Sequence, residues 1–306
     1  MRKVKFIQAD VFSDSPFGGN PVVVVPEPGA MTSDQMQRVA RGMTIAETSF
    51  VVPPTLADAS FAMRCYTPTT EVVYSGHQLL GTAYVLAEEG RIALDGDQTE
   101  VRVQLGETVR PVTLHAVDGR VTRVSTIARP AEFVRDVMPG RYGPLAAALS
   151  IDPMEVLHTG LPVQLVRTGL SCLIVPVHSL HTVRSLMPVG QSLDDLLHDI
   201  GGECLLAFSR DTLAQGNNAH VRVFAPPLGV EEDPATGAAN GALAAYLLRH
   251  GELNLDDQKQ VRLRCEQGSE MGRPSLIEML VDASVQPPSV RVGGRVARSL
   301  EGTVFY

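Results

Sequence analysis

Tryptophan is absent from this sequence, and aromatic residues make up only 5% of it. Cysteine is also rare: four thiols are spread over 306 residues, with no C-x-x-C pair and no zinc-like spacing. Isolated cysteines within apolar runs are typical of buried free thiols, not of a disulfide framework or a metal centre. We therefore expect free, structural thiols and no bound metal at Cys65, Cys172, Cys204 and Cys265.

Clusters of positive charge are absent too. The 26 Lys and Arg residues form no basic run, and with 34 Asp and Glu residues the formal net charge is -8. This balance argues against nucleic acid or an anionic membrane as the main partner. No apolar segment has the length of a transmembrane helix or the character of a signal peptide. These absences predict a cytoplasmic protein whose partner is a small molecule.

The sequence does contain enough apolar material for two hydrophobic cores. Hydrophobic residues make up 44% of the chain and charged residues 20%, which is typical of a soluble globular protein. A chain of 306 residues is also long enough for two ordinary domains.

Residues 230–241 combine acidic groups, a proline-led turn and the start of a helix. The pattern predicts a helix over residues 236–251, ended by Gly251 as a left-handed cap. The first N–H groups of a helix lack intrahelical partners, and Gly237 allows a ligand to approach them closely. The turn is therefore a candidate anion site in which Asp233 handles a proton. The alternative is a tight loop that caps a core helix.

A weaker copy of this unit occurs earlier in the chain. The pattern Arg-x-aromatic-x-Pro at residues 64–68 recurs 158 residues later at 222–226, and Gly76 precedes its counterpart Gly237 by 161 residues. Two matching strand, turn and helix units with a short insertion indicate an internally duplicated chain. Two such lobes could direct both helix N-termini into one cleft that binds a carboxylate. Chance similarity of the two units is the alternative.

An Asp-Gly turn at residues 118–119 predicts a hairpin, and we place the boundary between the lobes near it. Residues 1–118 then form an N-terminal lobe, and residues 119–290 form a C-terminal lobe. We expect the terminal strand, residues 291–306, to return to the first lobe. Thr32-x-x-Gln35 predicts a capping box for a helix that ends near Gly42.

A lone carboxylate, Glu47, stands just ahead of an apolar strand. Partial desolvation by Ala46 and the apolar neighbours would raise its pKa toward the range useful for moving protons at neutral pH. The alternative is a solvated residue at the start of a strand. Gly18 and Gly19 either free backbone N–H groups at a pocket edge or merely turn the chain, and no following helix or Lys-Ser/Thr supports a nucleotide loop.

Several further motifs follow one another along nearly the whole chain: PFGGNP at 16–21, AETSF at 46–50, SGH at 75–77, GTA at 81–83, EDPATG at 232–237, EQG at 266–268 and GRPS at 272–275. Together and in this order, they resemble the PhzF-like family, which is named after phenazine biosynthesis. The resemblance implies an α+β fold of the diaminopimelate-epimerase-like type, with two similar lobes that each wrap a curved, mostly antiparallel sheet around a central helix. It also implies an active site between the lobes and, usually, a homodimer.

The resemblance also implies an activity: cofactor-independent isomerisation of a cyclohexadiene carboxylate, in which one glutamate removes and returns a proton. Carried over by motif, Glu47 is the acid/base, and His77 and Asp233 are flanking polar groups that assist the proton transfer. The residues implied in substrate binding are Gly18, Gly19, Asn20, Ser75, Gly76, Thr236, Gly237 and Ala238.

Four positions differ from the family or from related epimerases and leave the substrate open. Ser75 and Thr236 stand near the places of the paired cysteines in related epimerases, which disfavours racemisation by two thiols. Ala238 replaces a residue that often carries a hydroxyl group, and Gln78 follows the histidine where Pro or Ala is common. The alternatives to an isomerase are an epimerase or racemase of the same fold and a noncatalytic carboxylate-binding protein.

Overall fold

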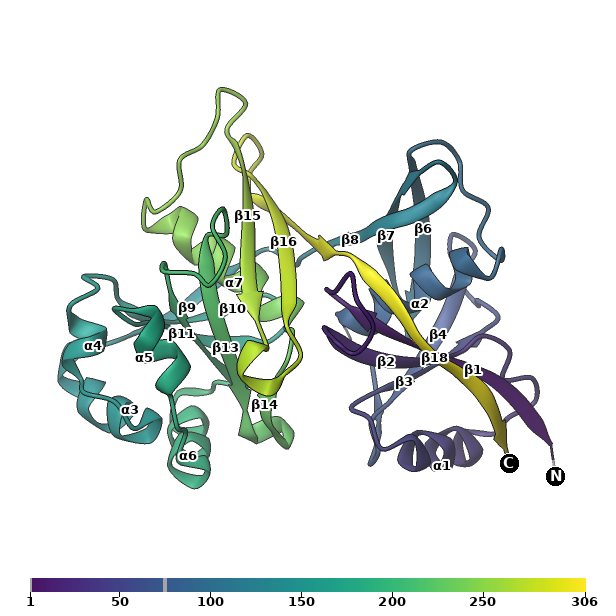
Figure 1. Ribbon diagram of the computed structural model, residues 1–306, viewed down its shortest axis with the longest axis horizontal. Helices are drawn as coiled ribbons and strands as arrows, with labels where there is room; N and C mark the ends of the chain where they lie inside the picture. Colours follow the sequence, from purple (N-terminus) through teal and green to yellow (C-terminus); the bar gives the residue numbers. More distant parts are fainter. Residues whose placement is uncertain (1, 74–75) are drawn as a thin grey trace. The chain divides into compact units, whose positions relative to one another are not determined.

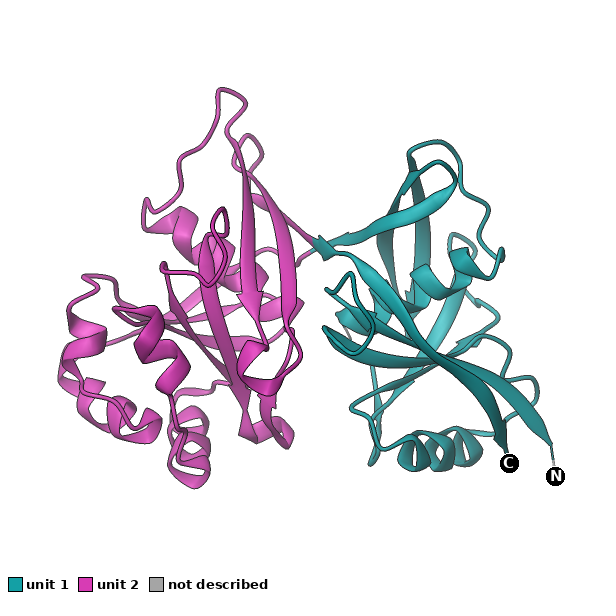
Figure 2. Ribbon diagram, viewed as in Figure 1, with its two compact units in different colours: residues 1–127, 293–306 teal, residues 128–292 magenta. Residues whose placement is uncertain are grey.

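A computed structural model describes residues 2–73 and 76–306 of the chain. The chain forms two compact units, which are coloured separately in Figure 2. Unit 1 consists of residues 1–127 and 293–306, and unit 2 consists of residues 128–292. The hairpin around residues 118–119 belongs to unit 1 as a whole, so the units divide after it, at residue 127, and not within its turn near residue 118.

Unit 1 is a mixed sheet with two helices (Figure 1). The strands β2 and β3, and the strands β4 and β6, pair in parallel, whereas β1–β2, β1–β18, β3–β4, β4–β5, β6–β7 and β7–β8 pair antiparallel. Its elements are β1 (Lys3–Val11), β2 (Asn20–Val25), α1 (Ser33–Met43), β3 (Thr48–Val52), β4 (Phe61–Tyr66), β5 (Glu71–Val72), α2 (His77–Glu88), β6 (Gln98–Leu105), β7 (Thr108–Val117), β8 (Arg120–Ile127) and β18 (Val296–Phe305).

Unit 2 has the same arrangement with additional short helices. The strands β11 and β12, and the strands β13 and β15, pair in parallel, whereas β9–β10, β10–β11, β12–β13, β13–β14 and β15–β16 pair antiparallel. Its elements are β9 (Glu132–Val137), η1 (Pro139–Arg141), α3 (Tyr142–Leu149), α4 (Met154–Leu157), β10 (Val163–Arg167), β11 (Ser171–Pro176), α5 (Leu180–Ser185), α6 (Gly190–Ile200), β12 (Cys204–Ser209), β13 (Ala219–Ala225), η2 (Pro226–Leu228), β14 (Val230–Asp233), α7 (Gly237–Arg249), β15 (Gln260–Gln267), η3 (Ser269–Met271) and β16 (Ser275–Asp282). The strand β17 (Ser289–Gly294) leads from unit 2 back to unit 1.

The duplicated segments of the sequence form strands that pair in the same way in both units. In unit 1, β4 lies antiparallel to β3 and parallel to β6, and in unit 2, β13 lies antiparallel to β12 and parallel to β15. The first motif arginine, Arg64, donates two hydrogen bonds to Glu71, at 2.7 and 2.6 Å. Its counterpart Arg222 donates two to Glu232, at 2.9 and 2.8 Å. The insertion therefore lies between each arginine and its carboxylate, where unit 2 forms η2.

Both faces of the strand β2 are buried, which explains its continuous apolar sequence. Val23 and Val25 belong to the hydrophobic cluster that contains the apolar face of α1. On the other face, α2 packs against Val22 at a glycine: a Cβ atom on Gly81 would lie 2.4 Å from Cγ1 of Val22. Gly81 therefore lets the central helix of unit 1 approach its sheet closely.

The sheet of unit 2 is also covered on both faces. Leu205 and Ala207 of β12 pack into the cluster that contains α3, α5 and α6. Their neighbour Phe208 faces α7, where its ring centroid lies 6.0 Å from that of Tyr246. One central helix against a mostly antiparallel sheet in each unit, α2 and α7, confirms the predicted fold class (Figure 1).

Local signals in the sequence mark several elements correctly. The capping box of α1 is present, with Thr32 and Gln35 bonded reciprocally. Asp118 and Gly119 both have positive φ angles, 51° and 71°, as a two-residue hairpin turn requires. The four cysteines are buried free thiols. In the described part of the chain, no helix is long and apolar enough to cross a membrane.

Candidate active site

Glu47 and His77, which are thirty residues apart in the sequence, meet in unit 1. Glu47 directly precedes β3, and its carbonyl oxygen accepts a hydrogen bond from the backbone N–H of Val23, 3.2 Å away. His77 is the first residue of α2. Its Nε2 atom lies 3.2 Å from Oε2 of Glu47, and the two side chains are 11% and 21% exposed. The structure thus pairs the predicted acid/base with one of its two predicted assistants.

His77 is neutral at neutral pH. Burial lowers the pKa of its imidazole from 6.5 to about 4, and a hydrogen bond to the backbone of Pro21 opposes this shift. Proline has no backbone N–H, so the ring must donate to the Pro21 carbonyl oxygen. Because Nε2 faces Glu47, Nδ1 is the donor, and Nε2 carries a lone pair. The imidazole can therefore accept a hydrogen bond from the carboxyl group of Glu47 when that group is protonated.

The glycine-rich loop before β2 has a demanding backbone geometry. Gly19 has a φ angle of 58°, and a Cβ atom there would lie 2.2 Å from the carbonyl oxygen of Val11. The N–H of Gly18 donates to Ser15, at 3.4 Å. Asp10, which is fully buried, accepts a hydrogen bond of 2.7 Å from the N–H of Phe17. Asn20 is buried at the start of β2. The positive φ angle and the close approach to Val11 give Gly19 a structural reason to be glycine.

The second acidic group, Asp233, ends β14 in unit 2, just ahead of α7. Thr236 occupies the N-cap position of α7, but its side chain does not cap the helix. Instead, its hydroxyl group donates a short hydrogen bond to Oδ2 of Asp233. Gly237 and Ala238 follow as the first two helical residues, whose N–H groups have no intrahelical acceptors. The carbonyl oxygen of Ala238 accepts a hydrogen bond from Thr168 at 3.0 Å.

One residue that sequence reasoning did not assign to the site is Gln267, at the end of β15. Its side chain is fully buried and bonds to Asp233, Thr236 and Asn240. The only signal for it was its place in the EQG motif, which carries no chemistry by itself. Of the predicted site residues, Ser75 lies outside the described part of the chain, and Gly76 is the N-cap residue of α2.

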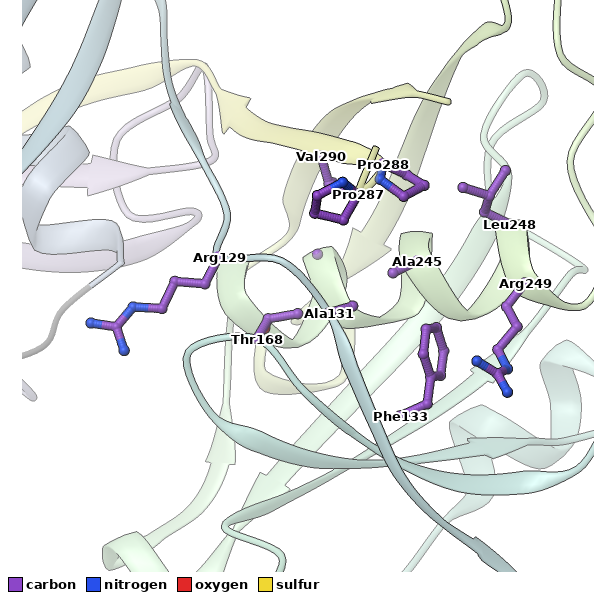
Figure 3. Close-up of a pocket in the computed structure, with 11 residues that line it drawn as sticks. Arg129, Ala131, Phe133, Thr168, Ala245, Leu248, Arg249, Pro287, Pro288 and Val290 are labelled. Carbon is purple, nitrogen blue, oxygen red and sulfur yellow. The ribbon is translucent and has the colours of Figure 1, made fainter. Parts of the chain in front are cut away.

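A cavity of about 220 Å³ lies in unit 2, beside α7. Figure 3 shows the side chains that line it. Gly241, Ala245 and Leu248 of this helix form one wall. The guanidinium group of Arg249 lies 4.3 Å from the ring centroid of Phe133. None of the predicted site residues lines this cavity. In the described residues, no group of three His, Cys, Asp or Glu side chains could hold a metal ion.

Solved structures identify the class of this architecture. The chain matches a hydroxyproline epimerase from Agrobacterium vitis with a TM-score of 0.63 at 14% identity, over 99% of this chain and 91% of the other. At this identity the match shows the fold alone, which is that of the diaminopimelate-epimerase-like proteins. A PhzF family protein of Bacillus anthracis matches more closely, with a TM-score of 0.90 at 25% identity over all of both chains.

The family itself follows from the sequence. The profile of the phenazine biosynthesis-like proteins, PhzC-PhzF, matches residues 9–302, and the chain belongs to this family. The trans-2,3-dihydro-3-hydroxyanthranilate isomerase of Pseudomonas aeruginosa is 30% identical, over 98% of this chain and 99% of that protein. The predicted family is thus confirmed, and the chain is an isomerase of the PhzF type.

Proposed function

We propose that this enzyme moves a proton on a small cyclic carboxylate without a cofactor, and that Glu47 is its single acid/base. The observation that supports this proposal best is the contact between Glu47 and a neutral His77, 3.2 Å apart. A hydrogen-bond acceptor beside a general base can hold the proton that the base has taken. The lone pair on Nε2 of His77 supplies that acceptor.

The proposed reaction has two proton transfers. The Glu47 carboxylate removes a proton from carbon, while the substrate carboxylate and its π-system absorb the negative charge. The protonated Glu47, held by a hydrogen bond to His77, then returns the proton to another carbon of the same π-system. The net reaction moves one proton and one double bond, with no change of oxidation state.

We propose that the start of α7 binds the substrate carboxylate. The N–H groups of Gly237 and Ala238 are unsatisfied within the helix, and the helix dipole favours negative charge there. Gly76 and His77 begin α2 in the same way. Asp233 would contact a polar substituent of the substrate.

The name of the Pseudomonas aeruginosa relative suggests dihydro-hydroxyanthranilate as the first substrate to test. Ala238 has no hydroxyl group to contact a substrate carboxylate, so we propose a related cyclic carboxylate as the natural substrate. We also propose, from the family resemblance, that the enzyme is a homodimer in the cytoplasm.

Solvent-deuterium incorporation tests the proposal. Candidate cyclic carboxylates are incubated with dialysed protein in D2O, and deuterium on carbon is followed by NMR. We expect exchange in the native protein and a loss of at least about 100-fold in Glu47→Gln, because general acid–base catalysis contributes on the order of 10² to 10⁴.

The control is Glu107→Gln, which removes an exposed carboxylate in the turn after β6. It should exchange at the native rate. Full exchange by Glu47→Gln would rule out the proposed acid/base. Tight binding of the carboxylate without any exchange in the native protein would indicate a noncatalytic binding protein.

A further inference from the structure

The motifs EQG and GRPS near the C-terminus have no part in the proton transfer proposed above. In the structure, both surround the segment that carries Asp233 in unit 2. Their contacts converge on Asp233, Pro234 and Thr236, in the turn between β14 and α7 that spans residues 233–236. The two motifs therefore share one structural role, which is to hold this turn in place.

The amide of Gln267 makes four hydrogen bonds, three within this turn and one to Asn240 of α7. Oε1 accepts from the backbone N–H of Thr236 at 3.1 Å and from Asn240 at 2.9 Å. Nε2 donates to the carbonyl oxygen of Asp233 at 2.6 Å and to Oγ1 of Thr236 at 3.1 Å. A backbone N–H can only donate and a carbonyl oxygen can only accept, so these two partners determine which side of the amide is oxygen and which is nitrogen.

The amide orientation determines the direction of the Thr236 hydroxyl group. Because Oγ1 accepts a hydrogen bond from Nε2 of Gln267, the proton of the hydroxyl group itself points to Oδ2 of Asp233. A threonine at an N-cap usually accepts a hydrogen bond from the helix backbone. Thr236 does not do so, and its hydroxyl group serves the carboxylate instead.

Two further residues hold the backbone of the turn. Gly268, with a φ angle of 80°, lies so close that a Cβ atom there would stand 2.5 Å from the carbonyl oxygen of Pro234. Ser275 donates a hydrogen bond of 2.9 Å to the same carbonyl oxygen. We call Gln267, Gly268 and Ser275 the clamp.

The clamp is itself anchored by buried charges. Glu266, next to Gln267, lies 3.0 Å from Nδ1 of the buried His220, and Glu270 lies 3.2 Å from Nε2 of the same ring. Glu266 also accepts hydrogen bonds from the backbone of Leu213 and Ala214, at 2.8 and 2.7 Å. The end of β15 and η3 are therefore fixed to β13 and to the loop after β12.

We infer that the clamp is a positioning device for Asp233: Gln267 directs the hydroxyl proton of Thr236 to Oδ2, which keeps Asp233 an oriented, ionised carboxylate. Gln267 is a positioning residue and contacts no substrate. The inference rests on the proposed function only where that function places Asp233 beside the substrate. The hydrogen-bond direction itself is a property of the folded protein.

The test is a titration of Asp233 that does not depend on activity. Aspartate labelled with ¹³C at the side-chain carboxyl group is incorporated into the full chain, and Asp233→Asn identifies the signal of Asp233. Thr236→Val removes the hydroxyl group at nearly constant shape. We expect the proton affinity of Asp233 to be roughly tenfold higher in this variant, because a hydrogen bond to a charged group is lost. Its titration midpoint should rise accordingly. Thr236→Ser should restore the native midpoint.

A double-mutant cycle tests whether Gln267 acts through Thr236. Gln267→Met should raise the proton affinity of Asp233 about threefold, since the hydroxyl group of Thr236 is then free to rotate. The same substitution should have no effect when combined with Thr236→Val. If Gln267→Met does not fold, the comparison of Thr236→Val with Thr236→Ser decides the question.

The matched control is Gln104→Met in unit 1, where another amide accepts hydrogen bonds from the backbone of Thr55 and Leu56, at 2.8 and 3.0 Å. It should leave the Asp233 midpoint unchanged. The inference is overturned if Thr236→Val has the native midpoint, if Thr236→Ser behaves like Thr236→Val, or if Gln104→Met shifts the midpoint equally. A native protein without deuterium exchange would refute the proposed function alone, because this titration would still give its result.

Discussion

Two buried histidines, one in each unit, have opposite electrostatic surroundings. Burial lowers the pKa of His77 to about 4. Burial also opposes the charge on His220, but its hydrogen bonds to Glu270 and Glu266 outweigh burial and raise its pKa above 6.5. The same contact helps to lower the pKa of Glu270 to about 2, against the effect of its own burial. His77 is therefore suited to accept a hydrogen bond, and His220 to hold two carboxylates together.

These surroundings predict opposite dependences of stability on pH. Between about pH 6.5 and about pH 4, the unfolded chain binds a proton at His77 that the folded chain does not. The free energy of unfolding should therefore fall by up to about 3 kcal/mol as the pH decreases through this range. The stabilisation from His220 is complete below pH 6.5 and is lost as the pH rises through its folded pKa.

Urea unfolding at several pH values checks both signs. His77→Gln should reduce the loss of stability toward pH 4, and His220→Gln should reduce the loss at alkaline pH. Equal pH profiles for the native protein and His77→Gln would contradict the neutral, buried state of His77.

At the scale of elements, the arginine of the duplicated motif is buried in one unit and more exposed in the other. Arg222 and Glu232 are 8% and 17% exposed, whereas Arg64 and Glu71 are 32% and 39% exposed. Arg222 also donates to the carbonyl oxygens of Val183 and Leu186, at 3.2 and 2.8 Å, and so attaches α5 to the sheet. Replacement of the arginine should therefore reduce the free energy of unfolding more in the buried copy of the motif than in the exposed copy.

Replacement of each arginine by methionine should reveal the difference. Arg222→Met leaves a largely buried carboxylate unpaired and should cost about 3 to 5 kcal/mol of unfolding free energy. Arg64→Met should cost about 1 kcal/mol or less, because water can solvate the more exposed Glu71. Urea unfolding of the two variants, each serving as the control for the other, measures both values. Equal costs would contradict the role of burial.

The elements themselves were largely predictable from local sequence. The capping box of α1, the Asp-Gly hairpin and the glycine after α7 are local signals, and the corresponding elements lie where they predict. The bounds of the terminal strand were less predictable. We expected one strand over residues 291–306, whereas the structure divides this segment between the end of β17, at Gly294, and β18, from Val296 to Phe305, which pairs with β1 along this length.

At the scale of the molecule, the two units differ in how the chain enters them. Unit 2 is one continuous segment, residues 128–292, with its own hydrophobic cluster. Unit 1 requires β18, which pairs with β1 from Lys3 to Val11. An isolated segment 128–292 should therefore fold, whereas an isolated segment 1–127 should not.

Expression of the two segments tests this prediction. Residues 128–292 should give a cooperative urea transition and dispersed amide signals in NMR spectra. Residues 1–127 should lack both, and should gain them when residues 293–306 are fused through a flexible linker. A stably folded segment 1–127 would show that the β1–β18 pairing is dispensable.

The sequence by itself determined the family and the duplicated organisation, because motifs, caps and turn residues act over a few neighbouring positions. The family resemblance then named Glu47, His77 and Asp233 as candidates. The tertiary structure decided which groups carry a proton and in which direction each hydrogen bond points. The neutrality of His77 depends on its burial and on the Pro21 carbonyl group, and the direction of the Thr236 hydroxyl group depends on Gln267, thirty-one residues away. Desolvation and hydrogen-bond direction depend on neighbours that only folding brings together.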